Sequence, residues 1–268
     1  MSRLHASLKA LREEHGFTLI EVLVAMSLGI IVSGIALSLL NFTTADVTRI
    51  SERVHADQTG RAALEKLMLA LHSSCVAVKA EPIRAGSTEK KLKFISETSP
   101  ENEHGEPSAS LPTITLHEVV YTEGSGKTEG TLTENSWPST NKSYSSVTEL
   151  TFNEKATPTK RKLLNGIKQT ENTKKELVPV FQYYRYYRES DTKPTLGELD
   201  PTPLSVPLEK EAPDVAKVTV SFSALPEGKE NKEDTSLGGG RPVALEDSAI
   251  LRLAPSSEES TNLPCAEL

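Results

Sequence analysis

The sequence predicts an α+β protein in which a long N-terminal helical spine, with a membrane half and an amphipathic half, packs on an antiparallel β-sheet domain. Three observations predict this fold: an apolar segment at 17–42, an amphipathic pattern that continues to residue 75, and strand-like runs over the remaining residues. The 268 residues are enough for one ordinary domain plus an extended element, or for two small domains.

The apolar segment is long enough to cross a membrane, and among its residues only Glu21 is charged. A helix over 17–42 is about 39 Å long, against a hydrocarbon layer of about 30 Å. A cleaved signal peptide has a shorter apolar run and a small-residue cleavage site at its far end, which this segment lacks. A plain signal anchor fits the length but leaves Glu21 unexplained, because an ionisable group in a membrane span is costly and usually functional.

The helix is expected to continue beyond the apolar segment, because no proline precedes Pro82. From Val47 to Leu71 apolar residues recur three and four positions apart, with polar residues between them. We therefore expect one helix over about 17–75, bent near Gly60, whose apolar stripe at 47–71 packs against the sheet.

After Cys75 the composition changes to β-branched and aromatic runs separated by Gly, Pro, Ser, Thr and Asn clusters. The clearest strand is 215–225, in which apolar and polar residues alternate. The expected strands are 92–96, 114–122, 130–134, 147–152, 178–187, 215–225 and 243–253. The tyrosine-rich run at 181–188 is interpreted as a strand with one aromatic face in the core, the alternative being a partner-binding strand.

Composition and motifs argue against several functions. The net charge is −7, with 30 basic and 37 acidic residues, which does not favour a nucleic-acid binder. Segment 124–128 imitates the end of a phosphate-binding loop, but Tyr121 stands where the loop needs its first glycine. Neither a metal-ligand spacing nor a nucleophile elbow is visible, so we expect no enzyme activity, no metal and no cofactor.

Segment 16–26, GFTLIEVLVAM, closely resembles the prepilin motif shared by type IV pilins and type II secretion pseudopilins. The resemblance implies that a prepilin peptidase cuts after Gly16 and methylates the new N-terminal residue, Phe17. It also implies that Glu21 pairs with the N-terminal amine of a neighbouring subunit as a filament grows. A buried carboxylate is tolerated when such a partner is present, so the resemblance explains Glu21.

The same resemblance implies a division into a prepilin leader at 1–16, a transmembrane and assembly helix at 17–42, an amphipathic continuation at 43–75 and an extracytoplasmic β-rich pilin-like domain at 76–268. The basic residues of the leader, Arg3, Lys9 and Arg12, favour a cytoplasmic leader and a single pass through the inner membrane. The expected partners are other pilin or pseudopilin subunits, the prepilin peptidase, the inner-membrane assembly platform and membrane lipid, with no nucleic acid.

Beyond the motif, the order of features is similar to that of W-type minor pilins and J-type minor pseudopilins. The matching stretches are 61–75, 131–139, 179–186 and 244–255. Two distant cysteines in an exported chain, Cys75 and Cys265, predict one disulfide, the alternative being two free thiols. The function expected is a minor filament subunit, and the alternative is a membrane-anchored extracytoplasmic binding or adhesion protein.

Overall fold

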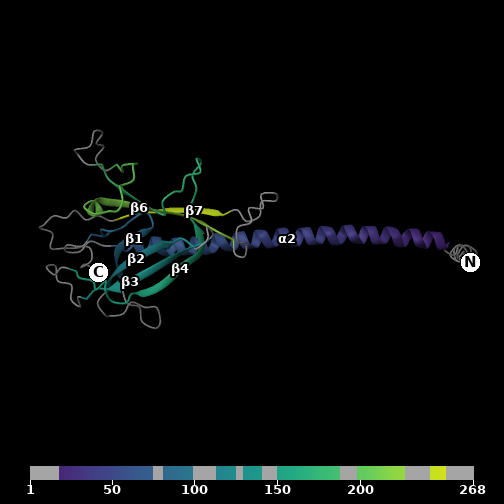
Figure 1. Cartoon of the computed structure of the whole chain (residues 1–268), viewed down its shortest axis with the longest axis horizontal. Helices are drawn as coiled ribbons and strands as arrows, with labels where there is room; N and C mark the ends of the chain where they lie inside the picture. The colour runs from purple at the N-terminus through teal and green to yellow at the C-terminus, as the bar shows by residue number, and fades with distance from the viewer. Residues whose placement is uncertain are drawn as a thin grey trace, which may run out of the picture. The chain divides into compact units, whose positions relative to one another are not determined.

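The computed structural model describes residues 18–74, 81–98, 113–124, 129–140, 150–187, 198–226 and 242–251. The chain divides into two compact units, of which the first ends at Ser51 and the second begins at Glu52. In the first unit the described residues from Leu19 onward are helical, whereas the second unit contains the end of that helix and all the described strands (Figure 1).

Helix α2, Leu19–His72, is a single element of 54 residues. Its C-terminal part lies in the second unit and buries Ala56, Leu64, Leu67 and Leu71, whose spacing puts them on one face of the helix. These residues belong to the main hydrophobic core together with side chains of the sheet. The expected helical spine packed on a sheet is therefore confirmed.

The apolar stripe does not meet the sheet along its whole predicted length. Val47 and Ile50 are each 63% exposed, and Val54 is 47% exposed. The expectation for 47–71 was wrong for these first residues, because the buried face of the helix begins only at Ala56. A helical period shows that a face is apolar, but it does not show which element covers that face.

Seven strands form one antiparallel sheet in the order β1-β2-β3-β4-β6-β5, and β7 pairs with β6. A short 3-10 helix, Ala212–Asp214, precedes β6. The strands are β1 Lys91–Thr98, β2 Thr113–Thr122, β3 Gly130–Pro138, β4 Thr159–Lys168, β5 Phe181–Arg185, β6 Val215–Ala224 and β7 Val243–Ile250.

The two faces of the sheet serve two cores, as the period of two along a strand requires. Leu92 and Phe94 of β1 lie in the main core with α2, whereas Ile95 lies in a second cluster with Leu116 and Trp137. The face that carries Leu92 and Phe94 is therefore the one that packs on the helix.

The tyrosine-rich run is a core strand. Phe181 and Tyr183 of β5 are 1% and 0% exposed. The Tyr183 hydroxyl lies 3.0 Å from the carbonyl oxygen of Lys91, to which it donates a hydrogen bond. Tyr184 is half-buried and Tyr186 is exposed. The preferred interpretation is confirmed, with Phe181 and Tyr183 forming the buried aromatic face.

Six of the expected strands are present with shifted ends, and the seventh, 147–152, lies partly outside the described residues. Of the segment 147–152 the structure describes 150–152, where Phe152 forms only an isolated bridge with Ser139. Strand β4 was missed altogether. Its first four residues are polar and exposed, and Gly166 has a φ of 64°, so the segment lacks the alternation that predicts a strand.

Gly60 permits close approach of α2 to the sheet, since a Cβ there would overlap the Leu245 side chain of β7 and touch that of Ala224 in β6. We expect Gly60→Val to lower the free energy of unfolding by about 1–3 kcal/mol through overpacking. Thermal unfolding measures this. Ala62→Val, at an exposed position of the same helix, controls for the helix propensity of valine, and an equal loss in both variants would contradict the packing argument.

Candidate functional site

Helix α2 begins with a side-chain cap that involves the only acidic residue of the apolar segment. Thr18 precedes the helix, and the backbone N–H of Glu21 donates to the Thr18 Oγ1 at 3.4 Å. The spacing Thr-x-x-Glu is that of a capping box, in which the threonine satisfies one of the free N–H groups of the first turn. The Glu21 side chain is exposed in the first turn of the helix, where the helix dipole favours negative charge.

The N-terminal part of α2 is apolar on all sides. Every large apolar side chain from Leu19 to Phe42 is exposed, from 42% for Val22 to 83% for Leu19. By length and composition α2 can cross a membrane, and it is the one such helix in the described part of the chain. A helix that is apolar all round requires a membrane or other protein to cover it.

Glu21 is the one predicted site residue that the structure describes. Gly16, Phe17, Cys75 and Cys265 lie outside the described residues. Glu21 therefore has a defined place, one turn into an exposed apolar helix, while the cleavage site and the cysteine pair remain predictions from the sequence.

A polar network that no sequence pattern indicates lies on the helix-facing side of the sheet. Ser96 Oγ of β1 lies 2.9 Å from His117 Nε2 of β2. His117 Nδ1 lies 2.7 Å from Glu134 Oε1 of β3, and the Nε of Arg161 in β4 donates to Glu134 Oε2 at 2.9 Å. The four residues come from four adjacent strands, so no spacing in the sequence reveals them.

The order serine, histidine, carboxylate resembles the relay of a hydrolase, but the surroundings are those of a buried polar cluster. Ser96 is 3% exposed, and the His117 ring stacks on Phe94 with centroids 5.0 Å apart. Nucleophilic catalysis requires a substrate to reach the hydroxyl oxygen. The arrangement instead satisfies polar groups of four strands beside the end of the main core. Among the described residues, no group of three or more His, Cys, Asp and Glu is arranged to hold a metal ion.

The network makes stability depend on pH through Glu134. Burial alone would raise the pKa of Glu134, but the hydrogen bond and charge of His117 and the charge of Arg161 outweigh it and hold the pKa below 4.5. A lowered pKa in the folded state stabilises the fold above the unfolded-state pKa, and that stabilisation is lost as the pH falls through the folded-state pKa.

We expect Glu134→Gln to lower the free energy of unfolding at pH 7 by about 2 kcal/mol, because it removes charge-assisted hydrogen bonds from a buried group. The difference in the free energy of unfolding between the variant and the wild type should shrink as the pH falls below 4.5. Thermal unfolding at a series of pH values from 7 to 3 measures this difference. Glu123→Gln is the control, since the Glu123–Lys90 pair is largely exposed and contributes little. A gap independent of pH would contradict the role of Glu134.

Residues 11–37 match the prokaryotic N-terminal methylation motif, which contains Glu21 and the start of α2. No curated protein and no solved structure matches the chain. The motif covers about a tenth of the sequence. The remainder of the described chain contributes the fold, a long N-terminal helix on an antiparallel sheet. This chain carries the prokaryotic N-terminal methylation motif at the start of its long helix, and its α+β architecture, a helix packed on an antiparallel sheet, is pilin-like.

Proposed function

We propose that this chain is a minor subunit of a type IV pilus or of a filament like that of type II secretion. The observation that carries the proposal is the match of residues 11–37 to the methylation motif at the head of a helix whose apolar side chains are exposed all round. Such a helix is stable in lipid before assembly and against the helices of neighbouring subunits afterwards.

Processing is the first step of the proposal. The prepilin peptidase cuts after Gly16 and methylates Phe17, and the leader remains on the cytoplasmic side of the inner membrane. Glycine before the cut leaves the backbone open to the enzyme, since it has no side chain. Removal of 1–16 leaves Phe17 at the free N-terminus, close to the described start of α2 at Leu19.

Pairing through Glu21 is the second step. The carboxylate lies on an otherwise apolar helix, where burial in a filament would be costly without a cation. A neighbouring subunit offers its methylated N-terminal amine as that cation. The pair sets the axial register between subunits, while the assembly platform of the inner membrane brings them together.

Two finer features of the proposal rest on the sequence alone. The similarity to W-type minor pilins and J-type minor pseudopilins favours a minor role, and a disulfide between Cys75 and Cys265 would join the region after α2 to the C-terminal region. A mass increase on alkylation that requires prior reduction tests the disulfide, and alkylation without reduction contradicts it.

The function itself is tested by isolating sheared filaments and measuring this chain against the major subunit by quantitative mass spectrometry. We expect it in the filaments at a small fraction of the major subunit. Its presence in membranes together with its absence from filaments would instead favour the membrane-anchored binding or adhesion protein.

A further inference from the structure

Strand β4 has one edge that is only partly paired. On one side it pairs with β3 from Thr159 to Ile167. On the other side it pairs with β6 only through Ile167 and Lys168, and the N–H of Leu225 donates to the Gly166 carbonyl at 2.7 Å. Pro226 follows and has no N–H to continue the pairing. Among the described residues, 159–165 therefore has no strand partner on this side, a length of about 23 Å.

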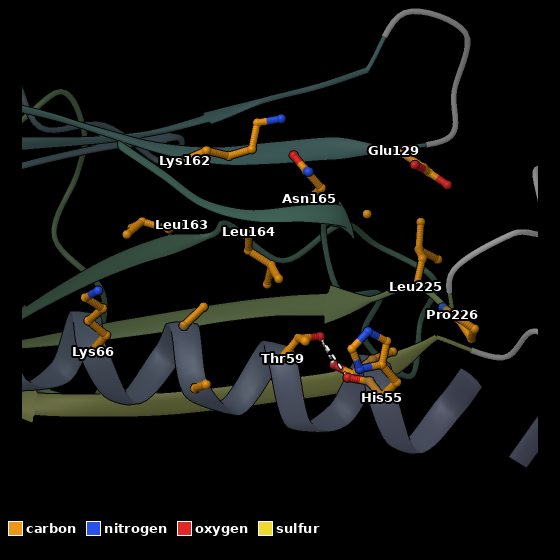
Figure 2. Close-up of a pocket in the computed structure, with 14 residues that line it drawn as sticks. His55, Thr59, Lys66, Glu129, Lys162, Leu163, Leu164, Asn165, Leu225 and Pro226 are labelled. Carbon is orange, nitrogen blue, oxygen red and sulfur yellow. Dashed lines mark hydrogen bonds between the residues drawn. The ribbon is translucent and has the colours of Figure 1, made fainter. Parts of the chain in front are cut away.

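A groove of about 640 Å³ lies along this edge, between β4 and helix α2. The helix contributes mainly small side chains to its lining, namely Ala56, Thr59, Ala62 and Ala63. Figure 2 shows Leu164 pointing from β4 toward the helix and Lys162 pointing away from it. An extended chain paired with β4 would lay alternate side chains on these small residues and present the others beside the lysines.

The charges around the groove select the kind of chain that fits. Lys160 and Lys162 of β4 and Lys66 of α2 are exposed, and none of them forms an ion pair or side-chain hydrogen bond with a described residue. Glu129 is the one acidic residue among those that line the groove, and it lies at the opposite end from Lys66 in Figure 2. Exposed lysines discourage pairing by neutral or basic strands, whereas an acidic strand would neutralise them.

We propose that the free edge of β4 at 159–165 and the adjoining groove bind an extended acidic segment of another protein by strand addition. Pairing of two copies through β4 is disfavoured, because it would bring Lys160 and Lys162 of both copies together on one small surface. The lysines thus provide specificity as well as attraction. This inference concerns the second unit alone and goes beyond assembly through the N-terminal helix.

The probe is a fluorescent peptide of five Glu-Val repeats, whose glutamates would lie beside the lysines and whose valines would lie over the groove. Its binding to the full chain in detergent micelles is measured by fluorescence anisotropy, and the contact is located by hydrogen exchange. We expect binding that weakens with salt, slower exchange in 159–165, and a loss of affinity of at least about fivefold in the double variant Lys160→Glu, Lys162→Glu.

Two controls separate strand addition from attraction of charge alone. The double variant Lys174→Glu, Lys210→Glu makes the same charge change at exposed sites that do not line the groove, and it should bind like the wild type. A peptide methylated on every backbone nitrogen keeps its charge but loses the hydrogen-bond donors of both edges, so it should not bind.

Three results would overturn the proposal. They are equal binding by the two double variants, equal binding by the methylated peptide, and slow exchange in the free chain of those amides of 159–165 that do not pair with β3. The third would show that another segment or a second copy already occupies the edge. Because the assay uses purified chain and no filament, failure here leaves the proposed assembly function intact, and absence from filaments leaves this proposal intact.

Discussion

Glu21→Leu is expected to lower the amount of this chain in filaments at least about tenfold, because in the proposed assembly it removes one partner of a buried ion pair and leaves the neighbour's amine uncompensated. Leucine is a good helix former and is apolar, so the helix and its membrane insertion should persist. The bond from the Glu21 N–H to Thr18 Oγ1 involves the backbone, so leucine retains it.

The measurement compares the chain in membranes with the chain in filaments. Membrane levels should be unchanged while the filament level falls. Glu65→Leu provides the matched control, since Glu65 is an exposed glutamate of the same helix, within the second unit. Normal incorporation of Glu21→Leu would show that the carboxylate has no part in assembly.

Leu71→Ala should lower the free energy of unfolding of the second unit by about 2–5 kcal/mol, the usual range for a leucine removed from a core. Leu71 is 0% exposed and lies in the main core beneath the sheet. Loss of its side chain removes buried apolar surface and leaves a cavity between α2 and the strands. The expected fall in the unfolding temperature is roughly 5–15 °C for a unit of this size.

Leu69 offers a control two residues away on the same helix, where the side chain is 64% exposed. Leu69→Ala should change the unfolding temperature by only a degree or two, because little surface is uncovered. Circular dichroism during heating measures both variants. Similar losses at the two positions would contradict the assignment of the buried helix face.

The helix could be predicted because its determinants are consecutive in the sequence. The run from Phe17 to Phe42 holds one charge, and no proline occurs before Pro82. Each of these is a local property of the chain. The main site residue, Glu21, could be singled out for the same reason, since its charge is conspicuous within an apolar segment.

The sheet could be predicted only in part. Apolar and polar residues alternate along the sequence of β6. Strand β4 instead begins with Thr159 and three basic residues and contains a glycine with positive φ. Its strand conformation depends on pairing with β3 along its length, and such long-range pairing overrides local preference.

The network of Ser96, His117, Glu134 and Arg161 could not be predicted at all. Each residue is ordinary within its own strand, and they meet only because the register places Phe94 opposite His117, and Glu134 opposite Arg161. A shift of one residue would turn each side chain to the other face. The partly unpaired edge of β4 could not be predicted from the sequence either, since it depends on where β6 diverges from β4.

Mass spectrometry of the N-terminal peptide, from chain purified out of the membrane fraction, shows whether the leader is removed after Gly16. We expect a peptide that begins with N-methylated Phe17 and lacks residues 1–16. An intact Met1, or a first residue near position 45, would contradict this expectation, because the apolar helix would then be an ordinary anchor or a removed signal.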